Sequence, residues 1–362
     1  MKTATVTWIY YRNFGTYLQA YALQQIVKQL GHENYIIYDN HFAKHADSFH
    51  SLRSVLGWIY GNVVKAIRCP QQFKVDRCYA RFLKDYLQID YQVKTTERLG
   101  EKYDAFLCGS DQIWSPYLDF EPYYFLGFPA ERKIAYAPSL GTGTCNEAYE
   151  KNAIPLIRQF DHLSTREEVG TALLKKYIDK PIQTVVDPTL LLDGNSWSKL
   201  TKKVDEEKYL LCYFLSPNDW YINHAKQYAR EKGLKLCIFG TNPHYREFAD
   251  KVIYGGPKEF LSYIKYADIV FTDSFHATIF SIHFHKNFQT FKRFEDGKGN
   301  DQNARLYNLF EKLYIDHHFV GKSDQFQPDC NASVNWFEVD NHLQDLRDFS
   351  LSYLKNSLKT DD

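Results

Sequence analysis

The sequence predicts an α/β protein with two domains, each built around a parallel sheet. Three observations support this fold class. The chain has 362 residues, which is more than one hydrophobic core usually supports. A strand, a helix and a second strand follow one another within 4–38, and this βαβ pattern requires a parallel strand pair. A second series of alternating strands and helices begins at 209, after a polar stretch at 193–208 that resembles a linker.

The first βαβ unit follows from local residue patterns. Residues 4–10 are β-branched and aromatic, as expected for a strand. Apolar residues recur on one helical face over 16–30, and Gly31 stands where helices commonly end. The segment 35–38 has strand character again. The turn at 11–15 therefore joins a strand end to a helix start.

The first domain is expected to span 1–193, and its later strands each end in a polar or glycine-containing loop. Strands are predicted at 104–108, 133–137, 162–165 and 184–186, with helices at 147–160 and 168–178. Open parallel sheets place their ligand sites at the carboxyl ends of their strands. These loops are therefore the first place to look for a site.

Residues 41–92 interrupt this alternation and predict a helical insertion. Within 52–68, apolar residues at helical spacing are flanked by basic residues. Such a helix commonly packs on its own domain, and peripheral contact with a membrane surface is the alternative. The N-terminal residues lack the apolar core of a secretion signal, and no apolar run is long enough to cross a bilayer. We therefore expect a cytoplasmic protein, with contact at the inner membrane face through 52–68 as an option.

The second domain is expected over 208–340. Strands are predicted at 209–215, 234–239 and 268–272, with helices at 219–232, 257–266 and 277–284. A last helix is predicted at 341–358, within a C-terminal segment 341–362 that is long enough to cross back to the first domain.

The composition narrows the functional classes. Lys+Arg and Asp+Glu are 44 each, so the formal net charge is zero, which argues against a nucleic-acid partner. The seven cysteines are scattered without a C-x-x-C pair, as in a reduced intracellular protein rather than a disulfide frame or zinc site. Aromatic residues make up 17%; they suit either sugar-stacking surfaces or an aromatic core.

The turn after strand 268–272 is the most informative segment for chemistry. Asp273, Ser274 and His276 lie there, directly before a helix. Free N–H groups and the dipole of a helix N-terminus bind anions, and a histidine there can donate to a phosphate or move protons. The alternative is that Asp273 or Ser274 only caps the helix.

Other strand ends carry weaker signals. Arg166 can clamp a carboxylate or phosphate, or it can pair with a neighbouring glutamate at the surface. The loops with Gly109, Ser110 and Asp111, and with Asn13 and Gly15, allow close backbone approach to a ligand. Neither loop matches a dinucleotide or P-loop motif. His283 and His285 lie on different sides of a helix, so no metal site is predicted.

Six of these segments together resemble the polysaccharide pyruvyl transferase family over roughly residues 4–320. In chain order they are Asn13-x-Gly15-x-x-Leu18 with Ala22-Leu23, Gly109-Ser110-Asp111-Gln112-x-Trp114, Ala135-Tyr136-Ala137-x-Ser139-x-Gly141, Ser164-x-Arg166-Glu167, Asp187-Pro188-Thr189-Leu190-Leu191 and Asp273-Ser274-Phe275-His276-Ala277. The resemblance implies two Rossmann-like domains facing a cleft, as in GT-B glycosyltransferases. It also implies transfer of a pyruvyl group from phosphoenolpyruvate to two hydroxyls of a sugar, giving a ketal, with no cofactor.

The resemblance also implies residue roles. His276 matches the donor-binding histidine and Arg166 an arginine at the same donor. Ser274 stands where relatives often carry arginine, and Arg305 or Lys286 is a candidate to supply that charge. Asp111 or Asp273 is the expected base beside His276. The expected acceptor or cleft residues are Asn13, Gly15, Gly109, Ser110, Gln112 and Trp114.

Two other functions fit the same pattern. One is a GT-B-type glycosyltransferase with a nucleotide-sugar donor, and the other is a non-catalytic glycan-binding protein. The expected acceptor is a sugar, free or linked to a lipid or nucleotide.

Overall fold

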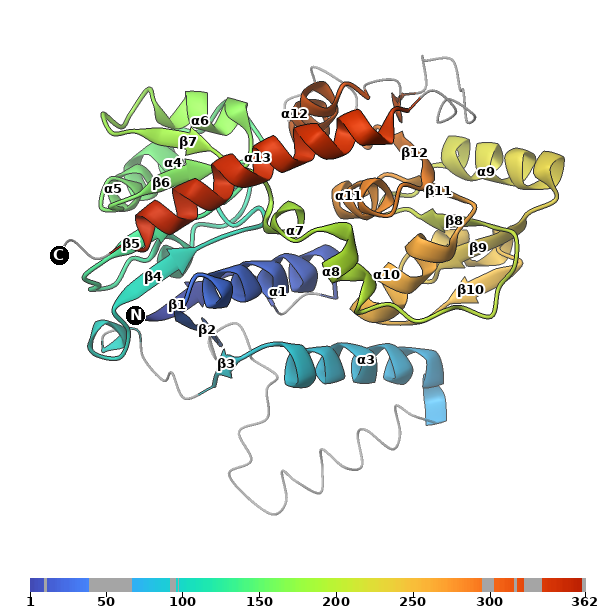
Figure 1. Cartoon of the computed structure of the whole chain (residues 1–362), viewed down its shortest axis with the longest axis horizontal. Helices are drawn as coiled ribbons and strands as arrows, with labels where there is room; N and C mark the ends of the chain where they lie inside the picture. The colour runs from blue at the N-terminus through green and yellow to red at the C-terminus, as the bar shows by residue number, and fades with distance from the viewer. Residues whose placement is uncertain are drawn as a thin grey trace.

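The computed structural model describes residues 1–9, 12–38, 67–91, 96, 98–294, 303–315, 318–321 and 334–359. Within these residues the chain forms two α/β lobes, one around a five-stranded sheet and one around a six-stranded sheet, with a further two-stranded sheet (Figure 1). Every strand pair in them is parallel. The predicted fold class, α/β with two parallel sheets, is confirmed.

The N-terminal lobe has the strand order β3-β2-β1-β4-β5. Its strands are β1 (Lys2–Val6), β2 (Glu33–Ile37), β3 (Ile89–Asp90), β4 (Ala105–Cys108) and β5 (Lys133–Ala135). The first strand thus ends earlier than the predicted 4–10. Helix α1 (Phe14–Gln29) begins at Asn13, whose side chain accepts a hydrogen bond from the Gly15 N–H. Gly31 follows the helix at φ 89°, as the predicted stop requires.

A small two-stranded sheet extends this lobe. It contains β6 (Leu163–Thr165) and β7 (Ile182–Thr184), with α6 (Glu168–Leu174) between them. A single bridge between Ile134 and His162 joins it to β5. The remaining short helices of this region are η1 (Leu99–Glu101), η2 (Pro122–Phe125), α4 (Glu147–Asn152), α5 (Ile154–Ile157), α7 (Pro188–Leu191) and α8 (Gly194–Ser198).

Only 67–91 of the predicted insertion 41–92 belongs to the described residues. There α3 (Pro70–Tyr86) packs against α1, with the Tyr79 ring 4.7 Å from that of Tyr17. The predicted amphipathic helix at 52–68 lies outside the described residues, apart from its last two positions. None of the described helices combines the length and apolar character that crossing a bilayer requires.

The C-terminal lobe has the strand order β10-β9-β8-β11-β12-β13. Its strands are β8 (Tyr209–Tyr213), β9 (Lys235–Phe239), β10 (Lys251–Ile253), β11 (Ile269–Thr272), β12 (Asn287–Phe291) and β13 (Phe319–Val320). Its helices are α9 (Asp219–Lys232), η3 (Pro243–Phe248), α10 (Pro257–Tyr266), α11 (Phe275–His283) and α12 (Ala304–Leu313). The sequence predicted β8, β9 and β11 but none of the outer strands.

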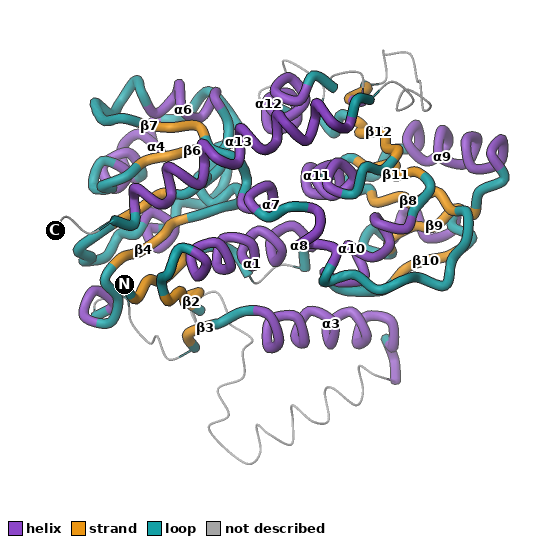
Figure 2. The backbone as a smooth tube through the Cα atoms, viewed as in Figure 1, coloured by secondary structure: helices purple, strands orange, loops and turns teal. Residues whose placement is uncertain are grey.

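The last helix, α13 (Trp336–Ser357), starts beside the C-terminal lobe and runs across the N-terminal lobe (Figures 1 and 2). Tyr353 donates its hydroxyl to the carbonyl of Ala135 (2.8 Å), and Ser350 Oγ accepts the Val186 N–H (3.0 Å). The helix therefore ties the end of the chain to strand ends of the first lobe.

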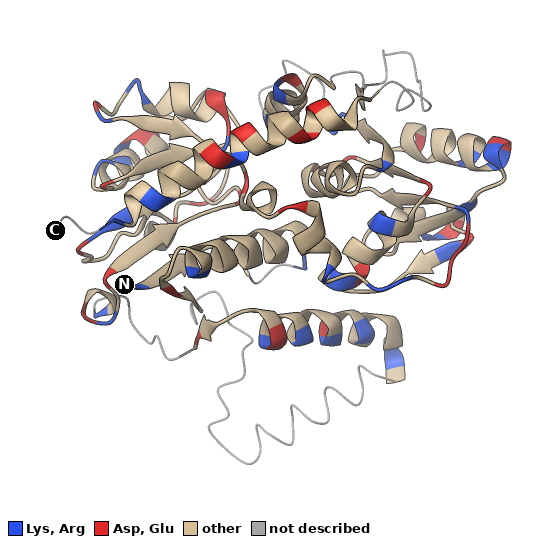
Figure 3. Cartoon of the chain, viewed as in Figure 1, with Lys and Arg blue, Asp and Glu red and all other residues tan. Residues whose placement is uncertain are grey.

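The two lobes share one hydrophobic core. The Phe14 ring of α1 stacks on Phe260 of α10 at 4.5 Å and lies 5.3 Å from Tyr213 of β8. Trp197, within the predicted linker 193–208, is fully buried and lies 5.0 Å from the Phe280 ring. The linker thus begins as a packed helix rather than an extended chain. Charges of both signs are spread over the outside of both lobes (Figure 3).

Candidate functional site

A pocket of about 150 Å³ lies between the lobes, at the carboxyl ends of strands from both sheets. The loops after β1 and β4 line one side, and the loops after β8, β11 and β12 with the start of α12 line the other. The lining residues are Trp8, Asn13, Thr16, Asp111, Gln112, Leu215, Asp273, Ser274, Phe275, His276, Arg293, Phe294, Asn303, Arg305 and Leu306. This is where open parallel sheets bind ligands, and the sequence had pointed to several of these loops.

His276 enters the pocket from the first turn of α11. Ser274 is the N-cap of that helix, and its side chain accepts the Ala277 N–H at 3.4 Å. The His276 side chain is buried, and its Nε2 has no hydrogen-bond partner among the described residues. A helix N-terminus favours negative charge. An imidazole at this helix N-terminus is therefore placed to meet an anionic ligand.

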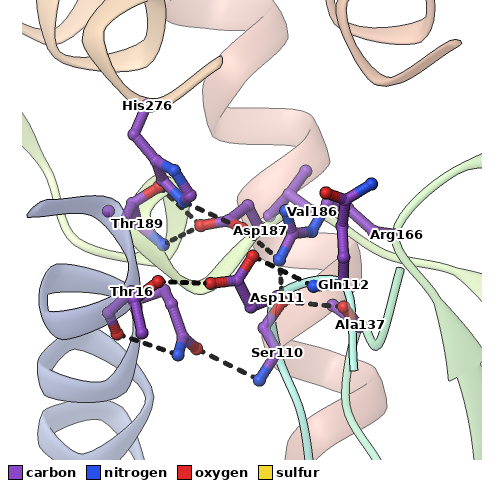
Figure 4. A network of polar contacts seen from close by, with 12 residues as sticks. Thr16, Ser110, Asp111, Gln112, Ala137, Arg166, Val186, Asp187, Thr189 and His276 are labelled. Carbon is purple, nitrogen blue, oxygen red and sulfur yellow. Dashed lines mark hydrogen bonds and ion pairs between the residues drawn. The ribbon is translucent and has the colours of Figure 1, made fainter. Parts of the chain in front are cut away.

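Asp187 links His276 to the N-terminal lobe. Its Oδ2 lies 3.7 Å from His276 Nε2 and 2.9 Å from Arg166 Nη2. Its Oδ1 accepts hydrogen bonds from the N–H and hydroxyl of Thr189. Arg166 Nη2 also donates to Ser110 Oγ at 2.6 Å. Figure 4 shows the resulting chain of contacts, from the loop after β4 through Arg166 and Asp187 to His276.

The charge state of Asp187 follows from this arrangement. Burial raises the pKa of Asp187, but the positive charge of Arg166 and the contact with His276 outweigh burial, so the pKa lies well below its usual value. Asp187 is therefore an anion at neutral pH. A buried carboxylate beside one ring nitrogen orients an imidazole.

Two arginines supply positive charge to the pocket. Arg305 Nε is buried and has no hydrogen-bond partner in the described part of the chain. Burial, reinforced by the charge of Arg166, lowers the pKa of Arg305 to about 10, so the group stays protonated near pH 7. Arg293 lines the pocket from the end of β12 and donates to Ser216 Oγ at 3.0 Å. The planar guanidinium group of an arginine can donate two parallel hydrogen bonds to a carboxylate or a phosphate. Both arginines are therefore candidates to bind an anionic ligand.

Two carboxylates face the same pocket. Asp111 accepts the Thr16 hydroxyl at 2.7 Å. Asp273 accepts the N–H groups of Leu215 (2.7 Å) and Ser216 (3.0 Å). Burial raises the pKa of Asp273 to about 6, although Arg293 and these N–H groups oppose the shift. A carboxyl group that titrates near neutrality can exchange protons with a substrate.

The structure brings together most of the predicted site residues. Asn13, Asp111, Gln112, Asp273, Ser274, His276 and Arg305 line the pocket. Lys286, the other candidate for the missing charge at Ser274, lies beyond the far end of α11 and does not line it.

Five other predicted residues do not line the pocket themselves: Gly15, Gly109, Ser110, Trp114 and Arg166. Arg166 and Ser110 are buried in the network with Asp187. Gly109 has φ 128°, and a Cβ there would lie 2.1 Å from the Tyr136 carbonyl oxygen. Trp114 is fully buried and donates Nε1–H to the Tyr124 carbonyl, so it is a core residue and the expectation that it lines the cleft is corrected.

Several residues of the site were not predicted, among them Asp187, Thr16, Arg293 and Trp8. Asp187 ends a predicted strand and stands directly before Pro188, so the rule that strand ends carry sites would have included it. Thr16 lies in the first turn of a predicted helix. Arg293 follows a strand that the sequence analysis did not identify.

The overall fold is similar to solved structures of low sequence identity. One, from Listeria monocytogenes, is described as a candidate UDP-N-acetylglucosamine 2-epimerase; it has a TM-score of 0.50 and 10% identity, with 99% of this chain and 91% of that chain covered. Another is S. aureus MnaA with UDP, with a TM-score of 0.50, 12% identity and coverage of 98% and 90%. At these identities the likeness shows a shared GT-B-like fold alone.

Sequence comparison is more specific. No curated protein matched the chain. The profile of one family, described as polysaccharide pyruvyl transferase, matches residues 13–291. The matched range includes His276 and Asp187, and the pocket residues outside it are Trp8, Arg293, Phe294, Asn303, Arg305 and Leu306. This match covers well over half of the sequence, and the chain therefore belongs to the polysaccharide pyruvyl transferase family.

Proposed function

We propose that this protein transfers the pyruvyl group of phosphoenolpyruvate to two hydroxyls of a sugar and releases inorganic phosphate. One observation carries the proposal: His276, whose Nε2 faces the buried carboxylate of Asp187 at 3.7 Å, lines the same interlobe pocket as Arg293 and Arg305. A small donor with a carboxylate and a phosphate group suits such a pocket. The acceptor is a saccharide, free or carried on a lipid or nucleotide, and the reaction is cytoplasmic.

The reaction needs proton transfer at two stages. The methylene carbon of the donor gains a proton while the first sugar hydroxyl adds to the neighbouring carbon and loses its own proton. The second hydroxyl then adds to that carbon as the C–O bond to phosphate breaks, and its proton leaves with the phosphate. The ketal and inorganic phosphate account for every atom of donor and diol. A positioned acid and base accelerate both stages.

The pocket offers residues for these roles. We assign His276 to the phosphate end of the donor, where its imidazolium, oriented by Asp187, stabilises or protonates the leaving group. Asp273 is the better candidate base because its pKa is raised to about 6, and Asp111 is the second candidate. Arg293 and Arg305 bind the donor charges. Arg166 was expected to contact the donor, but it pairs with Asp187, and we assign it a positioning role.

The test is phosphate release from phosphoenolpyruvate in the presence of a panel of methyl hexosides that carry free diols. His276→Ala should lower the rate at least ~10²-fold, the lower end for an acid–base residue. His244→Ala is the matched control, because His244 pairs with Asp219 on the surface away from the pocket. Equal rates for the two variants would remove His276 from its role.

The same assay separates the competing functions. Release of nucleoside diphosphate from a nucleotide sugar, with no phosphate from phosphoenolpyruvate, would replace our proposal with a glycosyltransferase. Sugar binding without turnover of either donor would identify a glycan-binding protein.

A further inference from the structure

A second and larger pocket adjoins the first. Its volume is about 450 Å³, three times that of the pocket around His276. Trp8, in the loop after β1, lines both pockets. The other lining residues come from the segment after β4 and from α4: Ile113, Ser115, Leu118, Asp119, Phe120, Glu121, Tyr124, Phe125 and Tyr149. The two spaces therefore meet at one tryptophan side chain.

The floor of this second pocket is aromatic and rigidly packed. Tyr124, Phe125 and Tyr149 are each less than 10% exposed. The Phe125 ring stacks on the buried Trp114 at 5.8 Å, and Tyr149 donates its hydroxyl to the Trp114 carbonyl. Trp8 meets Tyr124 edge to face at 6.2 Å. Trp114, expected in the cleft, thus supports the pocket from behind.

The rim combines exposed apolar and acidic side chains. Leu118 is 48% and Phe120 37% exposed, and the Phe120 ring lies 5.4 Å from that of Phe125. Asp119 and Glu121 flank Phe120 in the chain. Among the described residues, none that lines this pocket is basic, whereas the first pocket has two arginines. In the first pocket the arginines balance Asp111 and Asp273, whereas the described lining of the second offers no cation to balance Asp119 and Glu121.

We propose that this second pocket binds the acceptor sugar and selects a neutral pyranose; this inference rests on the proposed function. A pyranose ring has an apolar face of C–H groups that suits aromatic rings, and outward hydroxyls that donate to carboxylates. Asp119 and Glu121 accept hydrogen bonds from such hydroxyls. They repel the carboxylate of a uronic acid, because like charges meet without a compensating cation.

The position of Trp8 determines how the acceptor sugar is oriented in the second pocket. A sugar on the aromatic floor has one edge toward Trp8, and beyond Trp8 lies the pocket with His276 and Asp273. A pair of hydroxyls on that edge is the pair that reacts. The rest of a longer glycan extends past Phe120 and Leu118 into solvent.

Saturation-transfer NMR tests this assignment on the full chain. The probes are methyl β-D-glucopyranoside, methyl β-D-galactopyranoside and methyl β-D-mannopyranoside, with methyl β-D-glucuronide as the charged comparison. At least one neutral sugar should bind and the glucuronide should bind more weakly. Phe120→Ala should weaken neutral-sugar binding at least about threefold, in line with one lost aromatic contact. Phe337→Ala is the control, since Phe337 is 74% exposed on α13 and does not line the pocket.

A variant without the two carboxylates tests the expected selectivity for neutral sugars. The double variant Asp119→Asn with Glu121→Gln should narrow the difference between neutral sugar and glucuronide. The proposal is overturned if none of the neutral sugars binds, if Phe120→Ala and Phe337→Ala behave alike, or if the wild type prefers the glucuronide.

Phosphate release separates this inference from the proposed function. Turnover of phosphoenolpyruvate with an acceptor KM unchanged in Phe120→Ala would overturn the sugar subsite alone. Phe120-dependent sugar binding without any turnover of phosphoenolpyruvate would overturn the enzymatic proposal alone.

Discussion

Gly15 and His276 meet across the boundary between the lobes. A Cβ on Gly15 would lie 1.9 Å from Nδ1 of His276, which is far inside van der Waals contact. Gly15 lies in the first turn of α1 and His276 in the first turn of α11. Two helix N-termini from different lobes therefore converge on one imidazole, and only glycine leaves room for it.

Gly15→Ala should displace the His276 ring and lower kcat/KM for phosphoenolpyruvate at least ~10²-fold. The loss is steric, so circular dichroism should show an intact fold. Gly143→Ala is the control, because a Cβ there meets nothing closer than 3.7 Å. An active Gly15→Ala enzyme would show that the ring position seen here is not the working one.

Asp187→Asn should impair both stability and activity. It leaves the buried guanidinium of Arg166 without its anionic partner, and breaking such a buried pair costs about 3–5 kcal/mol. It also removes the anion that faces His276 Nε2. Urea unfolding and phosphate release measure the two effects. Asp219→Asn, which breaks the exposed pair with His244, should cost less than about 1 kcal/mol.

Protonation of Asp273 should lower the reaction rate on the acidic side of the pH–rate profile. Because the pKa of Asp273 is raised to about 6, the carboxyl is protonated below that pH and acts as a base above it. The kcat/KM for phosphoenolpyruvate should therefore rise with pH to a plateau, with a midpoint near 6. Asp273→Asn should lower the plateau and remove this limb. The donor's own phosphate also ionises, so a limb that persists unchanged in Asp273→Asn belongs to the donor and rules out Asp273 as the base.

His283 should make the fold sensitive to acid. Burial lowers the pKa of His283 to about 4, although its hydrogen bond to the Thr189 carbonyl opposes the shift. Between pH 6.5 and 4 the unfolded chain binds a proton that the folded chain does not, so stability is lost as pH falls through this window. His283→Gln keeps a donor for Thr189 and should flatten the decline in Tm between pH 6.5 and 4. An identical decline in both proteins would assign the acid sensitivity elsewhere.

Much of the fold was predictable because local signals and tertiary structure agree. The helix after β1 has an apolar face, an N-cap at Asn13 and a stop at Gly31. The outer strands β10 and β13 were missed because they are only three and two residues long. Such short edge strands are defined by pairing with a neighbour rather than by their own composition.

The site was predictable only in part. The strand-end rule found His276, Asp273 and Asp111, since parallel topology places those loops together. It could not show that Arg166 pairs with Asp187. The two residues follow different strands and are far apart in the sequence, whereas Glu167 stands directly beside Arg166 and was the obvious partner. The sequence around Trp114 does not distinguish a tryptophan that lines a cleft from one that is buried in the core next to it.

The stacking of Phe14 on Phe260 has a consequence for how the two lobes move. These rings belong to different lobes and share one apolar interior, so prying the lobes apart would expose that interior to water. A wide hinge motion between the lobes is therefore disfavoured. Calorimetry should accordingly record a single cooperative melting event for the whole molecule rather than one for each half.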